Sequence, residues 1–194
     1  AITAEGVIAL SPTTAGALTP DALGALTAAA VGSLDAAQVA AITPAQASGI
    51  TSSQVDALSG AQIAAITPST LGALGPAAVT SLSVEQVGAI TTAQATAVTP
   101  TQIDFLTTAQ IGAITPAAVA GLSAAAIGSL SVAQTAAITA TQVDSLSTAQ
   151  LAAITPAALA GLSATAIGSL DAAQVGALTV AQIDALSPAQ IKLI

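Results

Sequence analysis

The side chains of this chain that could take part in chemistry are hydroxyls, amides and a few carboxylates. Catalysis by acid–base or nucleophilic routes needs His, Cys, Lys or paired carboxylates. The sequence contains no His, no Cys and a single cation, Lys192. Ser and Thr are abundant, but no base is present to activate them. We therefore expect no catalytic residue and no enzyme. No motif is specific for a cofactor or a metal, so we expect neither.

The nine acidic residues are scattered singly along the chain. Four of them recur at equivalent places in a repeat described below: Asp56, Asp104, Asp144 and Asp184. They could form a sparse row that binds a cation or a partner weakly, but the simpler interpretation is a solvated turn residue that keeps the chain soluble. Lys192 is interpreted as a helix C-terminal cation or an end effect.

The charge balance excludes several partners. The net charge is −8, and one cation cannot neutralise a row of phosphates, so we expect no nucleic acid partner and no attraction to an anionic membrane surface. No stretch of 18 consecutive apolar residues is present, and we expect no membrane insertion. The lack of cysteine favours an extracellular or cell-surface location.

The hydrophobic content of 54% is mostly alanine, with one Phe and no Trp or Tyr. Large side chains normally fill the gaps between packed elements. A chain without them must bring its backbones together over small residues, which indicates repetition of one small unit.

A repeat of eight residues runs through the chain without a slip, from Ile2 as position 1 to Leu193 as position 8 of the twenty-fourth unit. Position 1 is always Ile, Leu or Val, and position 2 is Ser or Thr in twenty-one units. All nine Pro residues are at position 3, position 5 is Gln in fourteen units, and position 6 is Val, Ile or Leu in twenty.

These preferences describe a helix start. Ser, Thr and Asp cap helix N-termini, Pro suits the first helical residue, and a Gln three residues after the cap can reach back to the N–H of the cap. Position 2 is therefore the N-cap, and positions 1 and 6 form a hydrophobic staple. Twelve of the fifteen Gly residues are at position 7 or 8, where we expect a left-handed turn to end each helix.

The fold predicted from this pattern is an all-α solenoid of 24 units, each a short capped helix and a bend. Positions 1, 6 and 8 are expected in the core, and positions 3, 4 and 7 on the polar face. One continuous helix fails because each unit would leave an offset of about 80°, and strands fail because Pro and Gln recur within them. A β-solenoid with three units per coil remains an alternative.

Longer blocks lie on top of the unit. Residues 114–153 align with residues 154–193, whereas the blocks that start at Leu18 and Ile66 are one unit longer. An insertion or deletion of a whole unit indicates that eight residues are the indivisible structural element. We expect a single octapeptide-repeat solenoid over residues 1–194, as an excerpt of a longer array.

Two features depart from the pattern. Phe105, the only aromatic residue, takes a position that is otherwise almost always small, and we expect it to be displaced and partly exposed. The terminal units are unusually apolar, which predicts that the array continues or associates with itself. The residues concerned are Ile2, Val7, Ile8, Ile191, Leu193 and Ile194.

The consensus, as in LTTAQIGA at residues 106–113 and LSTAQLAA at residues 146–153, resembles the octapeptide-repeat tracts of very large proteobacterial secreted or surface proteins of adhesion type. This resemblance implies an extended extracellular stalk or filament, whose partners are other copies or neighbouring chains. The alternative is a surface-binding protein that presents Thr and Ala methyl groups to ice or to a polysaccharide. Against it, Ser replaces Thr freely and the hydroxyls are needed as caps.

Overall fold

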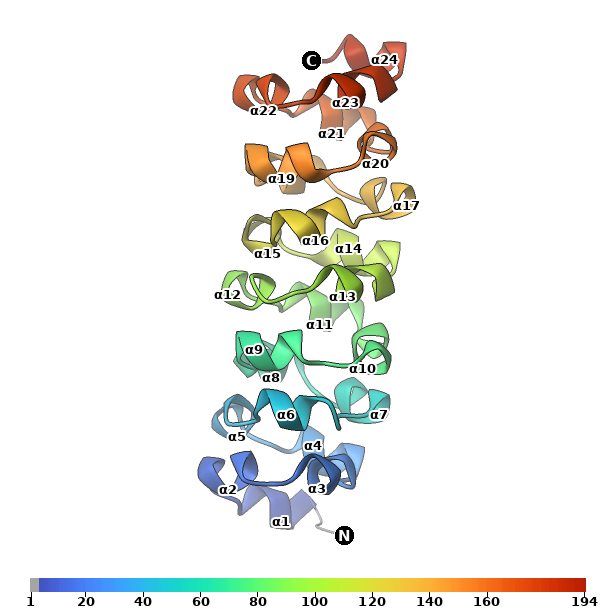
Figure 1. Ribbon diagram of the computed structural model, residues 1–194. Coiled ribbons are helices and arrows are strands. Elements are labelled where there is room, and N and C mark those ends of the chain that lie inside the picture. Colours follow the sequence, from blue (N-terminus) through green and yellow to red (C-terminus); the bar gives the residue numbers. More distant parts are fainter. Residues whose placement is uncertain (1–3) are drawn as a thin grey trace.

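The computed structural model describes residues 4–194, which form twenty-four short helices and no strand (Figure 1). The predicted all-α solenoid is confirmed, with one helix per unit, and the β-solenoid alternative is wrong. The helices are α1 (Ala4–Ile8), α2 (Pro12–Gly16), α3 (Pro20–Gly24), α4 (Ala28–Gly32), α5 (Ala36–Ala40), α6 (Pro44–Ala47), α7 (Ser52–Asp56), α8 (Gly60–Ala65), α9 (Pro68–Gly72), α10 (Pro76–Ser81), α11 (Val84–Gly88), α12 (Thr92–Ala95), α13 (Pro100–Phe105), α14 (Thr108–Ala113), α15 (Pro116–Gly121), α16 (Ala124–Gly128), α17 (Val132–Thr135), α18 (Ala140–Asp144), α19 (Thr148–Ala153), α20 (Pro156–Ala160), α21 (Ala164–Gly168), α22 (Ala172–Gly176), α23 (Val180–Ala185) and α24 (Pro188–Ile191).

The solenoid has three sides. Each helix packs mainly against the third helix before it and the third after it. Three units therefore complete one coil, and the coils stack into a column (Figure 1). We name the stacked sets face 1 (α1, α4, α7, α10, α13, α16, α19 and α22), face 2 (α2, α5, α8, α11, α14, α17, α20 and α23) and face 3 (α3, α6, α9, α12, α15, α18, α21 and α24).

The predicted caps start the helices. Every N-cap from α2 to α24 has an extended backbone, and all except Gly75 accept a hydrogen bond from a backbone N–H three residues later. Position 1 is the C-cap of several helices and is extended there, as at Ile66 with φ −61° and ψ 136°. The N–H of position 1 donates to the carbonyl of position 6 in the preceding unit, as Leu82 does to Val79 at 3.2 Å. The bend between two helices is therefore tight, and the backbone N–H of position 1 is hydrogen-bonded within it.

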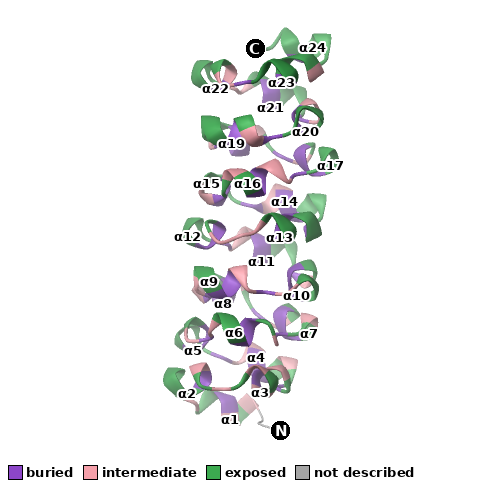
Figure 2. Cartoon of the chain, in the orientation of Figure 1, coloured by how far each residue is buried: buried purple, intermediate pink, exposed green. Residues whose placement is uncertain are grey.

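The buried residues follow three positions of the unit (Figure 2). Positions 1 and 6 form one continuous apolar core, as predicted, and positions 3, 4 and 7 are never buried in residues 4–194. The prediction that position 8 lies in the core is wrong. This position ends the helix at a corner of the coil and is half-buried or exposed in the described residues. Position 5 is the buried position that the pattern did not predict; the glutamines found there are all buried.

The prediction that glycine ends each helix in a left-handed turn is also wrong, because no glycine in residues 4–194 has a positive φ. Glycine is needed for close approach between coils instead. A Cβ at Gly72 would lie 2.7 Å from the carbonyl oxygen of Ala97 in the next coil, and one at Gly16 would lie 2.7 Å from that of Ala41. Small residues at positions 7 and 8 therefore let two stacked corners touch backbone to backbone.

Phe105 is 39% exposed, which confirms the prediction of a displaced and partly exposed ring. Position 8 lies at a corner, so the ring can leave the column without opening the core. Among the terminal apolar residues, Val7 is buried, whereas Ile8, Ile191, Leu193 and Ile194 are exposed. Ile2 lies outside the described residues.

Candidate functional site

The glutamines at position 5 are the polar groups that the fold brings together in its interior. The sequence predicted that each Gln would reach back to the N–H of its own cap. All fourteen do so, completing a capping box in their helices. The amide oxygen of each Gln is therefore committed to its own unit.

The amide nitrogen of the same side chain points the other way along the column, to the preceding coil. In all fourteen cases Nε2 donates to the carbonyl of a position 1 residue located 28 residues earlier. In most cases it also donates to the carbonyl of the position 6 residue 31 residues earlier. We call this series of contacts the glutamine ladder.

Gln94 shows the complete arrangement. Its Oε1 accepts from the backbone N–H of Thr91 at 2.8 Å, and its Nε2 donates to the carbonyls of Ile63 at 2.6 Å and Ile66 at 2.7 Å. The side chain is 1% exposed. An unpaired amide buried to this extent would be costly, and here each of its polar atoms is bonded. The bonds fix the distance and register of one coil on the next.

Units without Gln retain parts of this arrangement. Thr70, at position 5 of α9, donates its hydroxyl to the carbonyl of Ile42 at 2.8 Å, again 28 residues earlier. Other units have Ala at position 5, as at Ala78 and Ala118, where the side chain is buried as an apolar contact. No buried side-chain nitrogen or oxygen in the described residues lacks a partner.

The carboxylates do not form the row that their place in the unit suggested. Asp56 and Asp104 are six units apart, which is two coils, and both lie on face 1 in α7 and α13. Asp144 lies on face 3 in α18, and Asp184 lies on face 2 in α23. The reason is that the last three are spaced five units apart, which is not a whole number of coils. Residues 4–194 contain no group of three acidic side chains able to hold a metal ion.

Other polar side chains cap the helices. The hydroxyls at position 2 accept hydrogen bonds as caps, and Asp35 and Asp171 do the same at 2.7 Å to the N–H of the following Gln. Lys192 is the C-cap of α24, in keeping with its interpretation as a helix C-terminal cation. An open recess beside Asp104 is lined by Thr107, Thr108, Ser131 and other residues of faces 1 and 2, with one carboxylate as its only charged group.

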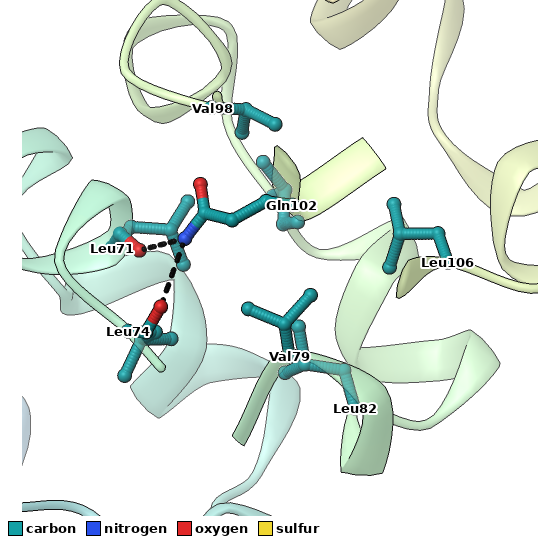
Figure 3. Close-up of a pocket in the computed structure, with 8 residues that line it drawn as sticks. Leu71, Leu74, Val79, Leu82, Val98, Gln102 and Leu106 are labelled. Atoms are coloured by element: carbon teal, nitrogen blue, oxygen red, sulfur yellow. Dashed lines mark hydrogen bonds between the residues drawn. The ribbon is translucent and has the colours of Figure 1, made fainter. Parts of the chain in front are cut away.

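A small apolar cavity lies next to one step of the ladder (Figure 3). Its volume is about 20 Å³, and Gln102 lies at its wall with hydrogen bonds to the carbonyls of Leu71 and Leu74. Val98 also lines it and is the only Val at position 1, where all other units have the longer Ile or Leu. The cavity is therefore explained by the shorter side chain of Val98, and it is too small for an organic ligand.

A comparison with known families finds a match over part of the chain. The family described as ALTTAQ repeat matches residues 143–180. Its six letters correspond to position 8 followed by positions 1 to 5, which read SLSTAQ at residues 145–150. The match indicates a tandem-repeat protein and includes the Gln of the ladder. No curated protein matches the chain. None of the described helices has the length and apolarity that crossing a membrane requires.

Proposed function

We propose that this chain is a non-enzymatic structural protein, a segment of an extracellular stalk or filament of adhesion type that associates with itself or with neighbouring chains. The observation that carries the proposal is the glutamine ladder. It repeats the same buried hydrogen bonds wherever position 5 is Gln, and Thr70 makes one of them with its hydroxyl. Side chains that could do chemistry are used to hold the stack, so the arrangement favours spanning a distance over converting a substrate.

The dimensions support a spacer. Stacked helices are about 8–10 Å apart, so eight coils form a column of about 65–80 Å. A column in which every coil contacts only its neighbours can extend without enlarging its core. The proposal therefore needs no dedicated binding site on each unit.

The alternative raised by the sequence, a surface that recognises ice or a polysaccharide, has less support. Such a surface needs free hydroxyls or methyl groups in one repeated pattern. Here the cap hydroxyls accept intramolecular hydrogen bonds, as Ser83 does from the N–H of Gln86 at 3.1 Å. The outward position 3 changes between Pro, Ala, Thr, Val, Ser and Gly from unit to unit.

The test is a measurement of shape together with activity. Small-angle X-ray scattering and electron microscopy of the purified chain should give a stiff rod about 65–80 Å long. The same material should neither inhibit ice recrystallisation nor bind polysaccharide columns. A compact or flexible particle, or ice inhibition by the monomer at micromolar concentration, would contradict the stalk proposal.

A further inference from the structure

The longer sequence blocks coincide with interruptions of the glutamine ladder. The blocks start at residues 18, 66, 114 and 154, and position 5 is not Gln in the first two units of each block. These units form the helices α3 and α4, α9 and α10, α15 and α16, and α20 and α21. From α5 onward every other unit has Gln at this position. The block period is therefore the period at which the ladder is interrupted.

Each interruption removes the hydrogen-bond partner of a backbone carbonyl. A ladder Gln donates to the position 1 carbonyl 28 residues earlier. At α15 and α16 the position 5 residues are Ala118 and Ala126, which have no donor for the carbonyls of Ile90 and Val98. Within residues 4–194 these two carbonyls accept no hydrogen bond. The same is true of the carbonyls that α20 and α21 leave without a donor, those of Leu130 and Ile138. A carbonyl left unpaired in a packed interior is destabilising unless water reaches it.

Hydroxyls on the outside of the column replace part of the lost hydrogen bonds. Thr92 donates its hydroxyl to the carbonyl of Ala117 in α15 at 3.0 Å, and both are exposed. Ser129, which follows α16, donates to the carbonyl of Pro100 at 3.4 Å, also at the surface. Because water competes for exposed partners, such bonds stabilise the stack less than the buried bonds of the ladder. At this step of the column, only Gln134 in α17 provides buried side-chain hydrogen bonds.

Packing at the interruptions is close and depends on small residues. A Cβ at Gly121 would lie 2.5 Å from the carbonyl oxygen of Thr92 in the preceding coil. Facing α20, the core residue at position 6 is Thr135, the only polar residue at that position in the chain, and its hydroxyl donates to the carbonyl of Ala158 at 2.7 Å. Small side chains bury little apolar area, and a gap of about 1 Å already removes up to about half of their attraction. The interruptions are therefore held mainly by contacts that act only at short range.

We propose that the start of each block is a joint, the place where the column opens first, while the coils of a run of Gln units stay stacked. The role of the joint rests on the function proposed above, because a joint matters in a stalk that bends or carries tension. The block boundaries after α8, α14 and α19 divide the column into bodies that move as units. The longer sequence blocks, which the eight-residue unit leaves unexplained, are these bodies.

The reaction rate of a buried thiol measures the opening, because the native chain has no Cys. Val55, Val87 and Val119 are position 6 residues of α7, α11 and α15, with exposed fractions of 1%, 0% and 3%. The carbonyls of Val55 and Val119 accept from a ladder Gln, whereas the residue that would donate to Val87 is Ala118. We expect Val87→Cys to react with a thiol reagent about tenfold faster than Val55→Cys or Val119→Cys under native conditions. Because Val87 lies between the two controls, fraying from either end cannot give this order.

Restoring a donor tests the cause of the opening. In the Val87→Cys chain, Ala126→Gln supplies an amide for the carbonyl of Val98 and should slow the thiol reaction by about fivefold, the effect of about one hydrogen bond. Ala125→Gln is the matched control, because it adds the same side chain at the exposed neighbouring position and should change the rate by less than about twofold. Circular dichroism shows whether each variant is folded. If Ala126→Gln does not fold, the comparison of the three cysteine variants decides the proposal alone.

Two results would overturn the joint. Equal reaction rates of the three cysteine variants, or a faster rate for Val55→Cys or Val119→Cys, would show that the column does not open first at the start of a block. A fast reaction of Val87→Cys that a folded Ala126→Gln variant leaves unchanged would show that the missing ladder bonds are not its cause. Neither result bears on the rod that scattering and imaging measure, so the joint and the stalk proposals fail separately.

Discussion

The glutamine ladder predicts a large effect of one isosteric substitution, Gln94→Glu. The change replaces the Nε2 donor with an oxygen that faces the carbonyls of Ile63 and Ile66, which now lie 2.6 and 2.7 Å from that nitrogen. The variant loses two hydrogen bonds and buries an acceptor against acceptors. Each lost bond costs about 1 kcal/mol, and unsatisfied buried partners add about 1–3 kcal/mol. We expect the free energy of unfolding to fall by about 3–5 kcal/mol.

Thermal unfolding followed by circular dichroism measures this loss. For a chain of this length 1 kcal/mol corresponds to about 2–4 °C, so Tm should fall by about 10 °C. Hydrogen exchange should locate the loss in α12 and in α8, whose Ile63 and C-cap Ile66 carry the acceptor carbonyls. Ala93→Glu is the matched control, because it adds the same charge at the exposed neighbouring position and should change stability by less than about 0.5 kcal/mol.

The sign of the pH dependence is a second check on Gln94→Glu. Burial should raise the pKa of the new carboxyl above its value in the unfolded chain. The protonated acid has a donor for one carbonyl, so the variant should regain stability below the unfolded pKa and lose it as pH rises through the folded pKa. If Gln94→Glu unfolds like Ala93→Glu at neutral pH, the ladder does not hold the coils together and the reasoning is refuted.

Four further substitutions test the packing. Gly72→Ala should destabilise the chain by about 1–3 kcal/mol, because its Cβ would lie 2.7 Å from the carbonyl oxygen of Ala97. Gly176→Ala, where a Cβ would meet no atom within 4 Å, should stabilise it by about 0.5–1 kcal/mol. Urea denaturation compares the two variants, and equal effects would contradict the role assigned to glycine. Val98→Ile should fill the adjoining cavity and raise the free energy of unfolding by about 1 kcal/mol, and a loss of stability would show that this space is not available. Phe105→Ala should cost less than about 1.5 kcal/mol because the ring is 39% exposed, and a cost of several kcal/mol would indicate a buried ring.

Sequence pattern was sufficient for the start of each helix. Caps, prolines and glutamines act over three or four residues, so the helix start at Thr91, the capping box of Gln94 and the staple positions followed from local rules. The whole-unit insertions correctly indicated eight residues as the structural element. The partial exposure of Phe105 was predicted correctly, but from a lack of room in the core, whereas in the structure position 8 lies at a corner of the coil.

Contacts between one coil and the next could not be derived from these local rules. The number of units per coil determines that Gln94 meets Ile66 and that Gly72 meets Ala97, and no local rule contains that number. The pattern suggests three units per coil only for a β-solenoid. Without the three-unit period of the coil, the pattern predicts a left-handed turn for glycine and leaves a row of the four aspartates open as an alternative. It also gives no partner for the amide nitrogen of each Gln.

The ladder also gives the column a mechanical property. Its bonds to the preceding coil run along the axis, so tension between the two ends acts on the coils in series, and no bond spans more than one step. The weakest coil should yield first while the others stay folded. Each yielding coil releases three units, about 80 Å of extended chain in place of about 8–10 Å of column. Pulled in a single-molecule instrument, such a rod would lengthen in equal steps of about 70 Å, dissipating energy at each one and keeping its remaining length stiff.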